Sequence, residues 1–191
     1  MLNSVFALKG FDLLQDLVLR NLVRSVERQA PSRNHTKKTL FLVSQATAKR
    51  VSELQALSRR VASQGEDLII SYVPEFLAKT ERAFNRLPRE FRLKSFTPLV
   101  APDDQERLLC PVRVLTYMLE RSKNFSHKPR NLFISPSNTA KPFSKNALLF
   151  LLKEIILQAH ESFPEELQQP LKLRAHDIRG IATLLNLSQN H

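Results

Sequence analysis

Apolar and polar residues recur along much of this chain with the spacing of helices. In residues 12–29 apolar side chains return at steps of four, which places them on one face of an amphipathic helix. Asp12 suits the cap position of this helix, and Pro31 stops the run. The apolar positions are Leu14, Val18, Leu22 and Val26. We therefore predict an N-terminal helix and linker over 1–34, ahead of a main domain over 35–191.

Two further helices are predicted in the next part of the chain. The nearly continuous apolar centre of 35–47 indicates a buried helix, for which Thr36 is the expected cap. After a short break, 49–60 again has helical spacing. Arg50 is expected at or near the start of that second helix.

The C-terminal half contains two more helical stretches. Pro111 opens 111–123, because proline is well tolerated in a first helical turn. The apolar stripe of this helix comprises Val112, Leu115, Met118 and Leu119. Tyr117 is expected to lie in the core with its neighbours Met118 and Leu119. Ser144 is the expected cap of the long apolar helix at 144–160.

Strand patterns lie between these helices. β-Branched residues and alternation mark 67–73, and a second extended run lies near 91–97. We predict a small antiparallel hairpin or meander with Lys79 in its connection. The stretch NLFIS at 131–135 predicts a short buried strand. The expected fold class is thus mainly α with a small antiparallel β-hairpin or sheet, an α+β architecture.

Composition narrows the classes of function. The chain has 191 residues, of which 42% are hydrophobic, and this is enough for a globular core. Lys and Arg number 29 against 18 Asp and Glu, so the net charge of +11 favours a polyanionic partner such as nucleic acid or an anionic membrane surface. Apolar runs fall short of the roughly 18–20 residues of a membrane span, and no signal peptide is recognised.

Neither a metal nor a cofactor is expected. The single cysteine, Cys110, excludes an internal disulfide framework and suits a buried packing position. No metal-ligand spacing joins it to His35, His127, His160 or His191, and no glycine-rich phosphate loop is present. Candidate chemistry must therefore rest on other side chains.

The stretch LRAHDIRGIATLLNL at 173–187 suggests such chemistry. It puts His176 three residues before Arg179, a spacing that brings two helical side chains to one face. Metal-free cleavage of a DNA phosphodiester needs cations around the phosphate, a nucleophile and a proton donor for the leaving 5′ oxygen. Arginine supplies a planar, permanently charged fork for the phosphate, and histidine and lysine suit proton transfer.

Two boxes in this sequence resemble the tyrosine recombinases of the phage-integrase type. ATAKRVSELQALS, which contains Arg50, is similar to their first arginine box, and HDIRGIATLL is similar to their second, His-x-x-Arg box. Their order, and a hairpin with a lysine between them, also fit that catalytic domain. The closest similarity is to the recombinases of DIRS-type retrotransposons, and it covers about 12–187.

The resemblance implies roles for individual residues. Arg50 and Arg179 would clamp the scissile phosphate, and His176 would assist proton transfer. Lys79 would protonate the leaving oxygen, although Lys94 on the next extended run could take that role instead.

The resemblance also implies a supporting residue and a setting. Glu53 would orient Arg50 through a hydrogen bond. The partner would be double-stranded DNA in the nucleus, without a small-molecule cofactor or a membrane. Family members assemble through C-terminal segments that this chain lacks, so a monomer is expected.

The sequence departs from the family at the nucleophile. In the family the nucleophilic tyrosine follows the second box, whereas the tyrosines of this chain, Tyr72 and Tyr117, both lie between the boxes. The expected function is a DNA-binding, integrase-like domain for recombination by phosphodiester transesterification, truncated at its C-terminus and inactive as given. The alternatives are a non-enzymatic DNA-binding relic of a mobile element and a basic helical interaction module.

Overall fold

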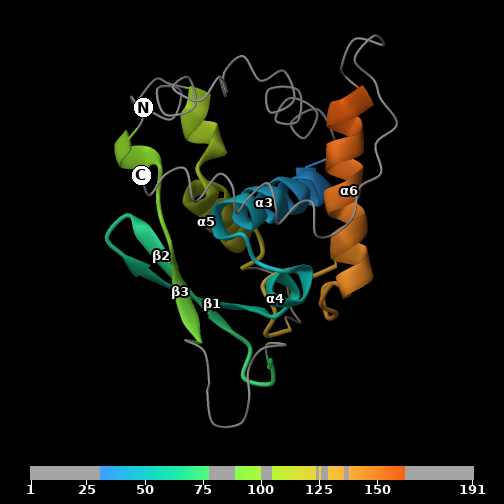
Figure 1. The fold of residues 1–191 in the computed structure, drawn as a ribbon. Helices are drawn as coiled ribbons and strands as arrows, with labels where there is room; N and C mark the ends of the chain where they lie inside the picture. Colours follow the sequence, from blue (N-terminus) through green and yellow to red (C-terminus); the bar gives the residue numbers. More distant parts are fainter. Residues whose placement is uncertain are drawn as a thin grey trace.

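The computed structural model describes residues 31–77, 89–99, 105–123, 125, 129–135 and 138–161. Within them, the elements in chain order are α3 (Pro31–Thr47), α4 (Val51–Gln55), β1 (Leu57–Gln64), β2 (Asp67–Tyr72), β3 (Glu90–Leu93), the 3-10 helices η1 (Thr97–Leu99) and η2 (Gln105–Leu109), α5 (Pro111–Arg121) and α6 (Lys145–Glu161). Figure 1 shows the sheet at the lower left, α3 across the centre beside α5, and α6 upright on the right. Helices combined with one small antiparallel sheet agree with the expected α+β class. The predicted helix at 12–29 lies outside the described residues.

Helix α3 is the buried helix expected from the sequence, but Thr36 is not its cap. Leu40 and Val43 are fully buried, as the apolar centre predicted. The helix begins at Pro31, so Thr36 lies inside it. Proline has no N–H to lose in a first turn and its φ angle is already helical, which explains the earlier start.

Helices α5 and α6 begin as predicted. Pro111 occupies the first turn of α5, and the Oγ of Ser144 accepts a hydrogen bond from the Ala147 N–H at 3.1 Å. Cys110 is fully buried, as expected for a packing residue. The prediction for Tyr117 was wrong, because this side chain is 47% exposed.

The sheet has the order β1-β2-β3, and both strand pairs are antiparallel. In β2, Leu68 and Ile70 are buried while Ile69 between them is only partly so. This alternation means that one face of the sheet packs on the core. Leu68 pairs with Leu93 and Ile70 with Phe91, so both predicted extended runs are strands of one sheet.

The helix predicted over 49–60 is wrong beyond Gln55. The residues that follow form β1, and the early part of this strand pairs with a distant segment, since the Leu57 carbonyl accepts the Leu132 N–H at 2.6 Å. The strand also pairs with β2 from Leu57 to Gln64, with a shift in register between Leu57 and Val61. Hydrogen bonds between distant residues and burial override the local helical preference here.

The stretch 131–135 is buried but is not a regular strand. Asn131 bridges to Ser58 in β1, whereas Ile134 bridges to Pro142. The two bridges have different partners, and a proline cannot donate the next hydrogen bond of a ladder. The predicted burial is confirmed, and the predicted strand is wrong.

Helix α3 ends in a residue with a left-handed backbone. Ala48 has φ 48°, and its N–H donates to the Ser44 carbonyl at 3.0 Å. Left-handed backbone brings Cβ close to the following carbonyl oxygen and is unfavourable for residues other than glycine. The bend at Ala48 turns the chain out of α3 and toward Lys49 and Arg50.

An ion pair joins α3 to α6. The Nζ of Lys37 lies 2.8 Å from the Oε1 of Glu154, and the Lys37 side chain is only 1% exposed against 25% for Glu154. A buried ammonium needs a carboxylate partner much more than a carboxylate at the edge of solvent needs an ammonium.

We expect Ala48→Gly to raise the free energy of unfolding by about 0.5–1 kcal/mol. Removing Cβ relieves its close contact with the following carbonyl oxygen, and this gain exceeds the cost of the extra entropy that glycine gives to the unfolded chain. Ala48→Val should lower it, since a branched side chain is worse in this backbone region. Urea denaturation would measure both. A glycine variant less stable than the parent would contradict the assigned strain.

The ion pair predicts that replacing Glu154 lowers the free energy of unfolding more than replacing Lys37 does. Glu154→Leu should lower the free energy of unfolding by about 3 kcal/mol, because the buried Lys37 ammonium loses this carboxylate. Lys37→Met keeps the volume and leaves the carboxylate of Glu154, whose side chain is 25% exposed against 1% for Lys37, so it should cost clearly less. Chemical denaturation of both variants tests this order, and equal losses would refute it.

Candidate functional site

The loop between α3 and α4 carries the arginine of the first box. Arg50 precedes the first residue of α4 and has an extended backbone, with φ −68° and ψ 153°. The position expected for Arg50, at the start of this helix, is confirmed. Its location follows from the bend at Ala48 and from the burial of Leu54, which is 1% exposed and anchors the single turn of α4 in the core.

Glu53 fixes the main chain of Arg50. Its Oε2 accepts a hydrogen bond from the Arg50 N–H at 2.7 Å, and its own N–H donates to the Arg50 carbonyl at 2.8 Å. The sequence led us to expect a hydrogen bond that orients the arginine, and the observed bond goes to the backbone amide and not to the guanidinium. Glu53 therefore sets the start of the arginine side chain and leaves its charged end available.

The Arg50 side chain is partly exposed. Among the residues that the structure describes, no carboxylate forms an ion pair with its guanidinium. By contrast, Arg92 pairs with Asp67 and Arg130 pairs with Glu75. An accessible guanidinium without a carboxylate can donate its forked hydrogen bonds to an external anion.

Lys49 lies beside Arg50 and contacts aromatic rings. Its Nζ is 4.8 Å from the ring centroid of Phe91 in β3 and 5.6 Å from that of Tyr72 in β2. Rings attract the ammonium through their quadrupole but leave its full charge in place. The loop thus presents two adjacent cations at the helix-facing side of the sheet.

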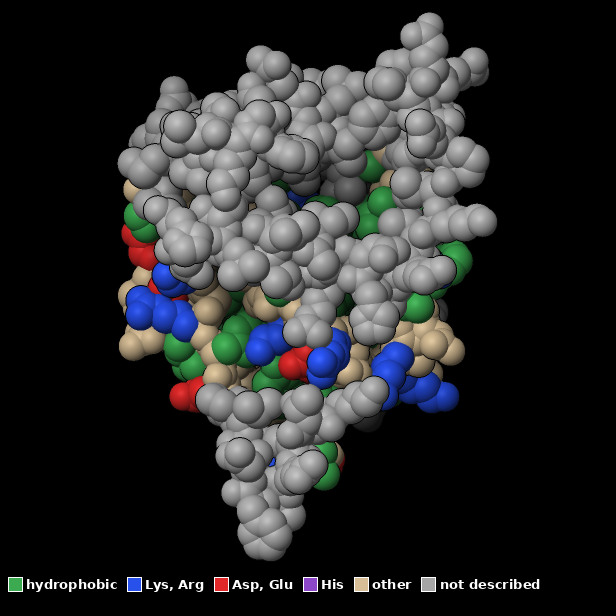
Figure 2. Space-filling view, in the orientation of Figure 1, with side chains coloured by type: hydrophobic (Ala, Val, Ile, Leu, Met, Phe, Trp, Pro, Cys, Tyr) green, Lys and Arg blue, Asp and Glu red, His purple; other side chains and the backbone are tan. Residues whose placement is uncertain are grey.

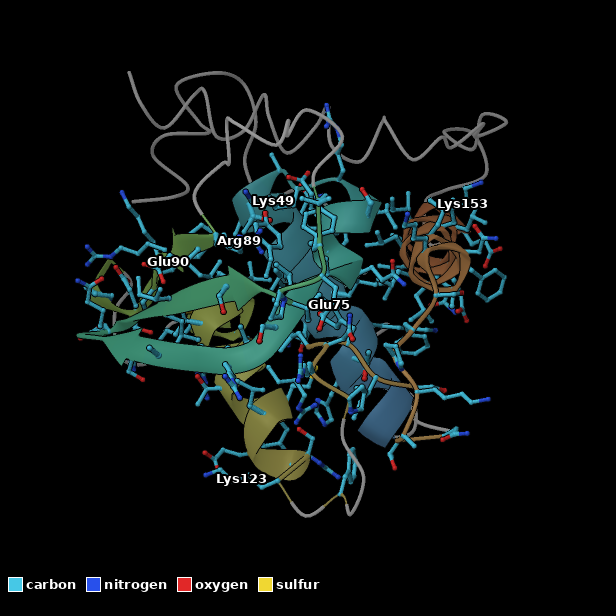
Figure 3. The ribbon with its side chains drawn as sticks, turned by 90° about the horizontal axis from the view of Figure 1, so that it is seen from below. Lys49, Glu75, Arg89, Glu90, Lys123 and Lys153 are labelled. Atoms are coloured by element: carbon cyan, nitrogen blue, oxygen red, sulfur yellow. The ribbon has the colours of Figure 1, made fainter. Side chains whose placement is uncertain are left out.

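Arg89 adds a third cation near the same strands. Its carbonyl accepts the Tyr72 N–H at 2.9 Å, and its Nη1 donates to the Pro74 carbonyl at 2.9 Å. In Figure 3 the labels of Lys49 and Arg89 lie in the same part of the view, and Arg89 is hydrogen-bonded to Tyr72, one of the two residues whose rings face Lys49. Neither Lys49 nor Arg89 was considered in the sequence analysis, because their proximity to Tyr72 and Phe91 depends on the pairing of β2 with β3 and has no local signal in the sequence.

Of the two alternative lysines, Lys94 lies within the described residues, next to the end of β3. Lys94 directly follows Leu93 and lies near Asp67, whose pKa is lowered by the Ser95 N–H, which donates to it at 2.7 Å, and by nearby basic groups. Asp67 and Tyr72 are at opposite ends of β2, about 17 Å apart at the rise of a strand. Lys94 is therefore at the end of the sheet away from Lys49.

The remaining predicted site residues are outside the described part of the chain. They are Lys79, His176 and Arg179. Their convergence on Arg50 stays a prediction, as does the assignment of catalytic roles.

The outer face of the sheet has a shallow hollow of about 440 Å³. Its lining consists of Arg59, Arg60, Val61, Ala62, Ile69, Ser71 and Glu90. Burial lowers the pKa of Arg59, whose guanidinium donates to the Ser122 hydroxyl. The Glu90 carboxylate makes this hollow less suited to an anion than the Lys49–Arg50 loop.

Cys110 makes contacts typical of a structural thiol. Burial opposes the thiolate, but hydrogen bonds from the Arg113 amide and from Ser95, Phe96 and Thr97 together lower the pKa of Cys110. The Phe96 N–H lies 3.4 Å from its Sγ, which ties the end of the sheet to α5. Within the described ranges, no group of three His, Cys, Asp or Glu side chains could hold a metal, and no helix is long and apolar enough for a bilayer.

Comparison with protein-family models, with curated proteins and with solved structures finds no significant match to this chain. The similarity of its two boxes to the tyrosine recombinases therefore stays a prediction from the sequence. The geometry of the Lys49–Arg50 loop and the net charge are the independent grounds for a functional assignment.

Proposed function

We propose that this chain is a DNA-binding domain of the tyrosine-recombinase type, whose ligand is the phosphodiester backbone of duplex DNA. The observation that carries the proposal is the Arg50 side chain, which is partly exposed and lacks a carboxylate partner among the described residues while Glu53 fixes its backbone. The net charge of +11 supports a polyanionic partner.

The order of elements supports the same proposal. The arginine box is followed at once by an antiparallel sheet, and the connection between β2 and β3 includes Lys79. This is the order that the resemblance implies, with His176 and Arg179 of the second box later in the chain. On the same resemblance we extend the proposal to a nuclear location.

The distribution of charge favours a broad contact. Figure 2 shows several Lys and Arg side chains, with Asp and Glu between them, on the described part of the face over the sheet and α4. Phosphates recur along duplex DNA, so several cations on one face can each neutralise one of them. A single small anion would need only one of these groups.

Arg50→Ala should weaken binding of the full chain to nicked duplex DNA by about tenfold, because a charge-assisted hydrogen bond contributes roughly 1.5 kcal/mol or more. Arg113→Ala is the matched control, since Arg113 is an exposed arginine on α5. Fluorescence anisotropy at fixed salt measures both affinities. Equal losses in the two variants would reduce the role of Arg50 to its contribution to net charge.

A second candidate is DNA binding without strand cleavage, and the positions of the two tyrosines favour it. The Tyr72 hydroxyl is buried, and its ring packs on Phe76 and Phe91 at centroid distances of 5.1 and 6.1 Å. Tyr117 lies on α5, where its hydroxyl accepts a hydrogen bond from Arg121 at 3.0 Å. A buried hydroxyl in an aromatic cluster and a hydroxyl hydrogen-bonded on α5 both differ from the accessible nucleophile that strand cleavage needs.

We expect no covalent adduct when this chain is incubated with a nicked DNA that traps a phosphotyrosine intermediate. The measurement is a denaturing gel with end-labelled DNA, under conditions where anisotropy shows full binding. An adduct that disappears in Tyr72→Phe or Tyr117→Phe would overturn the non-cleaving assignment.

A further inference from the structure

Lys49 is fixed by aromatic rings and not by an acid. Its ammonium lies 4.8 Å from the Phe91 centroid and 5.6 Å from the Tyr72 centroid, and it belongs to no ion pair among the described residues. Attraction to two neutral rings limits the positions of the ammonium without neutralising it. The result is a positioned and partly exposed positive charge.

Arg89 extends this charge along the strand. It comes directly before β3, and its main chain pairs with Tyr72 at 2.9 Å. Its guanidinium donates to the neutral Pro74 carbonyl, and no ion pair of Arg89 is found within the part of the chain that the structure describes. Alternation along β3 puts Glu90 on the opposite face from Phe91, so this carboxylate is directed away from the ring platform.

Lys49 and Arg50 are adjacent but do not share one direction. Arg50 has an extended backbone, and successive side chains in extended chain point to opposite sides. Lys49 is directed to the rings of β2 and β3, and the alternation of extended chain predicts a different direction for the Arg50 guanidinium. Divergent cations suit two separate phosphates better than one.

We propose that Lys49 and Arg89, on the platform of Tyr72 and Phe91, bind a second backbone phosphate of the DNA that Arg50 contacts. This inference rests on the proposed function, since it assigns a further subsite of the same surface. The ligand is a phosphodiester group of a nucleic-acid strand, for which regularly spaced cations are suited. Phe91 acts on this subsite through Lys49 and is a positioning residue.

The test is the salt dependence of DNA binding by the full chain. Lys49→Gln and Arg89→Gln should each lower the slope of log affinity against log salt by about 0.9, and the double variant by about twice that. Lys123→Gln is the matched control, because Lys123 is exposed at the end of α5 and lies across the molecule from Lys49 in Figure 3. It removes the same charge and should leave the slope unchanged.

A double-mutant cycle tests the platform. Phe91→Leu should weaken DNA binding severalfold in the parent chain and have no further effect in Lys49→Gln, because its role depends on the ammonium. Lys49→Arg should keep most of the affinity. Thermal denaturation of each variant establishes that it is folded, and a Phe91→Leu effect that persists without Lys49 would exclude a positioning role.

The outcomes separate the two proposals. If the parent chain does not bind duplex DNA, the proposed function fails and this subsite fails with it. If Arg50→Ala weakens binding but the Lys49 and Arg89 variants match Lys123→Gln, the function stands and the second subsite is wrong. If a polyglutamate peptide of equal charge competes as well as DNA, the surface serves an acidic peptide and both assignments to DNA are overturned.

Discussion

The burial of α3 is the constraint on which the rest of the structure depends. This helix packs against α5 and α6 and also contacts β3, and residues such as Leu40 and Val43 are fully buried in it. A buried leucine or valine side chain contributes about 1.5–3 kcal/mol relative to exposure, so the helix cannot shift without a large loss. Its C-terminal end therefore has a fixed place, and that end is where Lys49 and Arg50 leave the core.

The loop after α3 has a fixed backbone, and this limits the directions that its basic side chains can take. Ala48 takes a left-handed backbone, Arg50 takes an extended one, and Glu53 accepts the Arg50 N–H. Each feature removes freedom from the main chain, which lowers the entropy cost of ordering an arginine at a ligand. Unfavourable backbone at Ala48 fits this view, because such strain persists only where the surrounding structure enforces it.

The sequence predicted those elements whose signals are local. Pro111 and Ser144 mark helix starts through groups within one turn, and both starts were found. The start of β1 was missed because its bonds to Arg130 and Leu132 join residues far apart in the chain. The hairpin of β1 with β2 is local, and Gly65, with φ 62° in the two-residue turn, was an overlooked signal for it. Tyr117 was misassigned because it lies next to the apolar stripe of α5 but not on it. In the site, the motif located Arg50, whereas the environment of Lys49 depends on the pairing of β2 with β3 and could not be derived from spacing.

Lys37 and Lys49 have different partners, a carboxylate for the first and aromatic rings for the second. This difference is the strongest argument for an external anion. Lys37 in the core has Glu154 at 2.8 Å, as the cost of a buried charge requires. Lys49, at the end of the same helix, lies on two rings, and Arg50 beside it has its carboxylate neighbour bound to the main chain. A surface selected only for solubility has no need to position such charges, since solvated lysines serve that purpose without order. Cations that are ordered by aromatic and backbone contacts, yet keep their charge, are suited to a ligand that supplies the negative charge itself.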